Sequence, residues 1–128
     1  MHTDKDTDLT ELTEKIIGCA YTVSNTLGAG FLEKVYENAL AIELKNNQLS
    51  YQQQHPIKVT YNGNIVGEYI CDLIIESKVI VELKASKDID ASHIAQCLNY
   101  LKATNIRLGL IINFGKPRVE IKRVILGF

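Results

Sequence analysis

The sequence predicts a single α+β domain in which helices flank a mixed β-sheet. Two periodicities lead to this prediction. Apolar residues recur every three or four positions in three segments, as they do along the buried side of a helix. Elsewhere, short runs rich in Ile, Val and Leu are bounded by turn residues, as expected for strands. The 128 residues, 46% of them hydrophobic, suffice for one core and do not indicate a second domain.

The helical segments are residues 9–27, 32–45 and 90–104. Gly28 suits the end of the first helix, because glycine readily adopts the left-handed backbone found there. Residues 1–7 are expected to form a disordered tail, so that the domain spans residues 8–128. The stripe of the second helix expected to face inward comprises Leu32, Val35, Tyr36, Ala39 and Leu40.

The strands are expected to form two hairpins followed by two further strands. Asn62-Gly63 is a strong signal for a type I′ turn in the first hairpin. The second is a tight hairpin centred on Ser77. The predicted strands are residues 51–61, 69–75, 79–85, 108–112 and 118–122.

Three charged residues interrupt the apolar second hairpin. If its turn centres on Ser77, Asp72 falls opposite Glu82, since antiparallel partners are equidistant from the turn. Lys84 lies two residues beyond Glu82, and the period of two returns it to the same face. We therefore expect one patch that holds two carboxylates and one ammonium group.

This patch suggests a bound metal. Carboxylates in an apolar sheet are costly unless a cation, a metal or a shifted pKa offsets their charge, and one lysine cannot neutralise two acids. Oxygen ligands without nearby His or Cys favour magnesium, manganese or calcium over zinc. The alternative is a structural ion-pair network, which predicts that apolar replacements of Asp72, Glu82 and Lys84 are neutral or stabilising.

Charge and cysteine content exclude several classes of protein. A net charge of -1 argues against coating of duplex DNA by bulk electrostatics, so any nucleic-acid contact must be local. Cys19, Cys71 and Cys97 are widely separated and odd in number, which indicates neither a disulfide framework nor a zinc site. No apolar run approaches membrane-spanning length and the polar start is unlike a signal peptide, so we expect a cytoplasmic protein without membrane contact.

Asp72 followed by Glu82-Leu83-Lys84 resembles the motif of the PD-(D/E)XK nuclease superfamily, with Cys71 where the motif has proline. Such a resemblance implies a restriction-endonuclease-like αβββαβ core, here with an extra N-terminal helix. It also implies a metal-dependent nuclease that hydrolyses nucleic-acid phosphodiester bonds.

Two further motifs strengthen the resemblance. Gly30, Glu33 and Tyr36 fit the GxxExxY pattern of a small-protein branch of the superfamily. Gln96 and Tyr100 resemble the QxxxY helix of its RecB-like members. The order of the motifs agrees from about residue 9 to residue 125.

The resemblance assigns a role to each motif residue. Lys84 would orient the attacking water and stabilise developing charge, and Gln96 would position the water or Lys84. Mg²⁺ or Mn²⁺ is the implied cofactor, and DNA is favoured over RNA as the substrate. The implied metal ligands are Asp72, Glu82, Glu33 and the Leu83 carbonyl. The implied catalytic residues are Asp72, Glu82, Lys84, Gln96 and Glu33.

Substrate contacts are predicted at a helix face and at a basic cluster. His93, Gln96 and Tyr100 share one side of the third helix and offer neutral hydrogen bonding. The basic cluster consists of Lys116, Arg118, Lys122 and Arg123. It would bind phosphate or, equally, only protect an edge strand from pairing with another chain. Tyr36 is expected to pack or to position other groups. The predicted substrate-binding residues are Tyr100, His93, Tyr36, Lys116, Arg118, Lys122 and Arg123.

A second function fits the same fold. A chain with little beyond the core has few elements to hold a substrate. The protein could therefore be a catalytically inactive module that binds nucleic acid or a protein partner, or a homodimer whose second subunit completes the groove.

Overall fold

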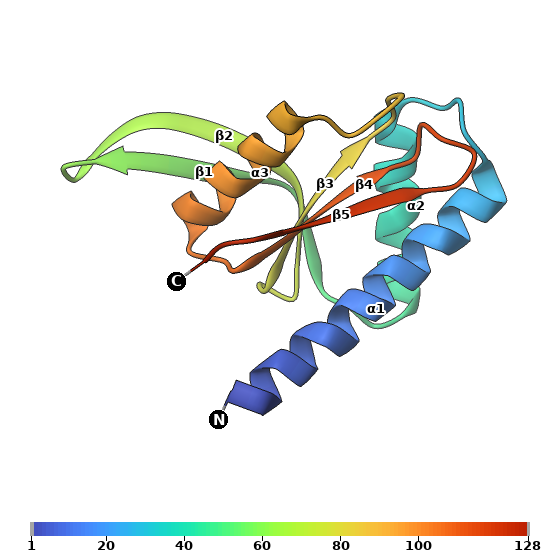
Figure 1. Cartoon of the computed structure of the whole chain (residues 1–128), viewed down its shortest axis with the longest axis horizontal. Helices are drawn as coiled ribbons and strands as arrows, with labels where there is room; N and C mark the ends of the chain where they lie inside the picture. Colours follow the sequence, from blue (N-terminus) through green and yellow to red (C-terminus); the bar gives the residue numbers. More distant parts are fainter. Residues whose placement is uncertain (1, 128) are drawn as a thin grey trace.

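A computed structural model describes residues 2–127 of the chain, with side chains from Leu9 to Gly127. Five strands form one sheet in the order β1-β2-β3-β4-β5 (Figure 1). Two helices, α1 (His2–Leu27) and α2 (Glu33–Asn46), pack on one face, and α3 (Ala91–Thr104) packs on the other. This arrangement confirms the predicted α+β class. The predicted tail at residues 1–7 lies outside the residues whose side chains are described.

The three helices end within one residue of the predicted positions, but α1 begins at His2 and not at the predicted residue 9. Gly28 follows α1 with a φ of 69°, and its N–H donates to the Ser24 carbonyl at 2.8 Å. The Asp90 carboxylate caps α3 by accepting from the N–H groups of Ser92 and His93.

The strands confirm both predicted hairpins. Asn62 and Gly63 have φ values of 50° and 79°, as a type I′ turn requires, and Ile75 pairs with Val79 across the second turn. β3 and β4 are parallel and joined through α3, whereas the other neighbouring strands are antiparallel. The strands are β1 (Tyr51–Tyr61), β2 (Asn64–Ile75), β3 (Val79–Lys84), β4 (Leu108–Asn113) and β5 (Glu120–Ile125).

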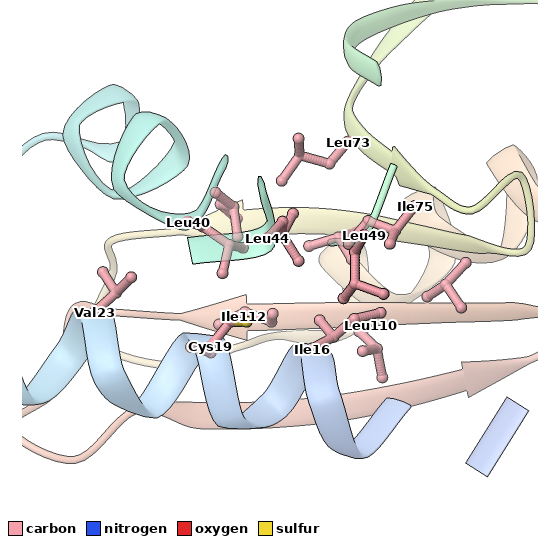
Figure 2. Close-up of a cluster of buried hydrophobic side chains, with 14 of the residues drawn as sticks. Ile16, Cys19, Val23, Leu40, Leu44, Leu49, Leu73, Ile75, Leu110 and Ile112 are labelled. Carbon is pink, nitrogen blue, oxygen red and sulfur yellow. The ribbon is translucent and has the colours of Figure 1, made fainter. Parts of the chain in front are cut away.

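The main core lies between the sheet and helices α1 and α2. Figure 2 shows Ile16 and Val23 of α1 facing Leu40 of α2 and Leu110 of β4. The predicted stripe of α2 is partly wrong, because Leu32 is 79% exposed and Val35 is 38% exposed. Leu32 is the residue that caps the helix. The inward side consists of Tyr36, Glu37, Leu40, Ala41 and Leu44.

The sheet splits into a fork where β2 and β3 part. Their paired residues run from Ile75 and Val79 only to Leu73 and Val81. Beyond this point β2 continues with β1 as a long hairpin that extends past the rest of the sheet, while β3 stays with β4 (Figure 1). Leu73 belongs to the core beneath α1 and α2, but Cys71, two residues away, belongs to the cluster beneath α3. Strand β2 therefore reverses its faces at the residue between them.

Candidate active site

The fork is held by Asp72 and Glu82, which bond to each other's strands. The Asp72 N–H donates to Glu82 Oε2 at 2.8 Å, and the Leu83 N–H donates to Asp72 Oδ2 at 2.8 Å. Side-chain carboxylates thus take the place of the main-chain ladder that ends one residue earlier. Asp72 and Glu82 lie next to each other, as predicted. They are not a regular cross-strand pair, because their side chains lie between the two strands and bond to the opposite backbone.

Each carboxylate retains an oxygen available to a ligand. From the described residues, Asp72 Oδ1 accepts only a long 3.3 Å bond from Gln54, and Glu82 Oε1 accepts none. Among the described residues no fully buried side-chain oxygen lacks a partner, so Glu82 Oε1 reaches the solvent. Since the N–H and C=O of a strand residue point the same way, the Leu83 carbonyl also faces the fork.

The fork is short of positive charge. Burial, reinforced by the Asp72 carboxylate, raises the pKa of Glu82 from 4.5 to about 8, while the Asp72 N–H and Lys84 act in the opposite direction. Burial also raises the pKa of Asp72, against the hydrogen bond from Leu83. A site that disfavours its own carboxylate charges is suited to a cation.

Lys84 lies on the same sheet face as Glu82, as the period of two predicts. Its charge lowers the pKa of Glu82, so the two side chains are close enough to interact. Lys84 nevertheless forms no ion pair of 4.0 Å or less with any described residue. Its ammonium group is therefore available to a substrate or a water molecule.

Glu33 stands in the exposed first turn of α2. Its carboxylate raises the pKa of both Asp72 and Glu82. No three His, Cys, Asp or Glu side chains of the described chain are grouped closely enough to hold one ion. The geometry thus assembles two acids and a carbonyl, and the role of Glu33 as a third ligand remains a prediction.

A divalent ion fits this donor set. Asp72 and Glu82 supply hard oxygens, each with one oxygen fixed by the backbone and one available, and the Leu83 carbonyl supplies a third. This donor set holds oxygen atoms alone, which hard divalent cations prefer.

Glu37, which is only 3% exposed, was not among the residues predicted from the sequence. Its Oε1 accepts from Lys34 at 3.1 Å and from Gln54 at 2.8 Å, and its Oε2 accepts from Lys34 and Gln53. Gln54, at a φ of 52°, joins Glu37 to Asp72. A glutamate between the buried Tyr36 and Leu40 was the signal that could have revealed it.

Tyr36 positions the loop before α2. Its hydroxyl donates to the Gly28 carbonyl at 2.5 Å and accepts from the Phe31 N–H at 3.1 Å, and its ring stacks on Phe114 at 4.6 Å. Gly30, between these bonds, has a φ of 115°, which favours glycine. Tyr36 is fully buried, which fits the expected packing or positioning role and leaves no exposed surface for the predicted substrate contact.

The helix α3 presents Gln96 and Tyr100 to a groove beside the fork. Burial, reinforced by the charge of Glu82, raises the pKa of the Tyr100 hydroxyl to about 12. His93 has a different structural task. Its Nδ1 accepts from the Asp90 N–H at 3.1 Å in the capping box of α3.

The four predicted basic residues do not form one patch. Lys116 pairs with Asp88 at 3.1 Å and with Glu120 at 3.5 Å. Lys122 and Arg123 are neighbours on strand β5, so their side chains point to opposite faces. Arg118 is exposed in the loop before β5. This placement weakens the predicted phosphate cluster and agrees with protection of an edge strand.

A scan against family models matches residues 10–124 to the PD-(D/E)XK nuclease superfamily. The match covers most of the chain, and the protein belongs to this superfamily. A comparison with curated proteins found no match. Among the described residues, no helix combines the length and apolar character needed to cross a membrane.

Two solved structures share the fold. A protein named SSO0001 is 17% identical with a TM-score of 0.59, over 74% of this chain and 50% of that one. An alkaline exonuclease from Laribacter hongkongensis is 12% identical with a TM-score of 0.54, over 73% of this chain and 56% of that one. The chain thus spans about half the length of both, and the restriction-endonuclease-like fold is confirmed.

Proposed function

We propose that the protein is a metal-dependent nuclease that hydrolyses phosphodiester bonds, with DNA as the favoured substrate. The observation that carries this proposal is the fork, where Asp72 and Glu82 are fixed by reciprocal backbone bonds with free oxygens beside Lys84. Membership of a nuclease superfamily supports it, as does the likeness to an alkaline exonuclease.

Asp72, Glu82 and the Leu83 carbonyl would hold Mg²⁺ or Mn²⁺, with Glu33 contributing directly or through water. Such an ion, when bound, polarises a phosphoryl oxygen and lowers the pKa of water. The protein's own part is to hold these oxygens rigidly, because both carboxylates are tied to the backbone of the opposite strand.

Lys84 would place its ammonium group beside the phosphate and stabilise the negative charge that develops during hydrolysis. Its freedom from ion pairs with described residues supports this role. Gln96, exposed on α3, would position the water or the substrate.

The test is a cleavage assay on single-stranded, duplex and flapped DNA with Mg²⁺ or Mn²⁺. Asp72→Asn should reduce cleavage to background, and Lys84→Ala should reduce it by about 10²- to 10³-fold, the loss typical of removing one charge-stabilising group. Glu68→Gln and Lys78→Ala change exposed charges outside the site and should leave activity intact. Equal cleavage by wild type and Asp72→Asn would contradict the proposal.

Two observations favour the second candidate, an inactive nuclease-fold module that binds nucleic acid or a protein. Among the described residues no third acidic side chain joins Asp72 and Glu82, and the match spans about half of each structural neighbour. Nucleic-acid binding that is unaffected by metal removal, with no cleavage, would support this module.

Three finer assignments accompany the proposal. The roles of Gly30 and Tyr36 in shaping the loop before Glu33 support membership of the GxxExxY branch. A homodimer would supply surface that a small core lacks, and size-exclusion chromatography with light scattering tests it. We also retain a cytoplasmic location as a proposal.

A further inference from the structure

A groove of about 740 Å³ lies between the β1–β2 hairpin and α3. Thr60 and Tyr69 line it from the hairpin, and Gln96, Asn99 and Lys102 line it from the helix. In Figure 1 the hairpin extends beside α3 and beyond the rest of the sheet. Pockets that bind small molecules span roughly 300–1,000 Å³, so this groove is large enough to hold a ligand of that size.

The groove leads to the fork. Tyr100 lines it and packs in the same buried cluster as Cys71, the residue directly before Asp72. Tyr100 also packs against Tyr69, with ring centroids 5.8 Å apart. A chain lying in the groove would therefore continue to the two carboxylates.

The chemistry of the lining indicates the ligand. Both charged residues that line the groove, Lys58 and Lys102, are basic, so the groove suits an anion. Tyr69 is 51% exposed and offers an aromatic face. The Gln96 and Asn99 amides, free of hydrogen bonds to described residues, can donate to and accept from base edges.

We propose that this groove binds a single strand of nucleic acid, with a base stacked on Tyr69 and a phosphate near Lys102. Aromatic faces combined with basic side chains are the usual means of holding single strands, because unpaired bases expose their π-faces. In a duplex those faces are covered by neighbouring bases. The proposal rests on the proposed function and narrows its substrate to single-stranded segments or strand ends.

Fluorescence anisotropy in EDTA measures this binding without cleavage. The probe is a short fluorescein-labelled oligothymidylate, alone or annealed to oligoadenylate. The single strand should bind more tightly than the duplex, and Tyr69→Ala should weaken its binding by about tenfold, as loss of one base–aromatic stack does. Tyr69→Phe should retain binding, and Lys102→Ala should reduce the slope of log affinity against log salt by roughly 0.7.

Tyr61→Ala is the matched control, since Tyr61 is 70% exposed on the same hairpin but does not line the groove. It should bind like wild type, and thermal melting should show that each variant is folded. The proposal is overturned if Tyr69→Ala also binds like wild type, if duplex binds as tightly as single strand, or if neither binds.

The two proposals fail differently. Cleavage that requires Asp72, together with unchanged oligonucleotide binding by Tyr69→Ala, would overturn the proposed single-strand binding in the groove but support the proposed nuclease activity. Binding that requires Tyr69, without cleavage in Mg²⁺ or Mn²⁺, would support the groove and overturn the nuclease.

Discussion

Two buried glutamates, Glu37 on α2 and Glu82 in the fork, are almost equally buried but differ in their hydrogen bonds. Glu37, 3% exposed, accepts hydrogen bonds from Lys34, Gln53 and Gln54, and both of its oxygens are used. Glu82, 5% exposed, accepts one bond from the Asp72 backbone. Burial of a charge is costly unless partners compensate it, and Glu37 has these partners within the protein.

The difference separates a structural acid from a functional one. Glu37 anchors Gln54 and through it supports Asp72, so its partners are complete without a ligand. Glu82 is left with a pKa of about 8 and one unbonded oxygen. A buried acid with incomplete partners is typical of sites where a ligand supplies the missing charge.

The largest difference between the two glutamates should appear in the stability of Glu82→Gln in metal-free buffer. Between the unfolded pKa of 4.5 and the folded pKa of about 8, the folded state keeps a proton that the unfolded state releases, so wild-type stability falls as the pH rises. Glutamine has no proton to lose but can still accept from the Asp72 N–H. In urea denaturation, the free energy of unfolding of Glu82→Gln relative to wild type should therefore increase by roughly a few kcal/mol from pH 4 to pH 9.

A stability difference that stays constant over this pH range would break the comparison, since it would mean that Glu82 titrates normally in the folded protein. The Glu68→Gln variant, at an exposed position of the same hairpin, serves as the control and should show no such trend.

Glu37→Gln should instead lower the free energy of unfolding, and the change should be smaller than that caused by Glu82→Gln. In Glu37→Gln one acceptor oxygen becomes an amide donor that faces Lys34, Gln53 or Gln54. The loss of a hydrogen bond to a charged partner should cost about 1–2 kcal/mol in the free energy of unfolding. Denaturation at pH 8 checks this; a stabilised Glu37→Gln would show that the two acids are alike after all.

Much of the fold could be predicted because it depends on local patterns. The Asn62-Gly63 turn, the Ile75–Val79 pairing and the end of α1 at Gly28 each follow from residues a few positions apart. The contact of Asp72 with Glu82 followed from counting outward from the turn.

Other features depend on tertiary geometry that no local pattern specifies. The reversal of β2 at Asp72 accompanies an unusual backbone at Gln54, eighteen positions away in the chain, where φ is 52°. The burial of Glu37 follows from the packing of α2 against the sheet, where Gln53 and Gln54 of β1 donate hydrogen bonds to its carboxylate. The groove along Tyr69 exists because the hairpin continues past the fork.

Isothermal titration of Mg²⁺ at pH 7, repeated in buffers of different ionisation enthalpy, tests most directly whether the fork is a cation site. Because Glu82 holds its proton below a pKa of about 8, ion binding should release close to one proton in wild type. Glu82→Gln should bind more weakly and release none. Binding without proton release, binding unaltered in Glu82→Gln, or no binding at all would contradict the account.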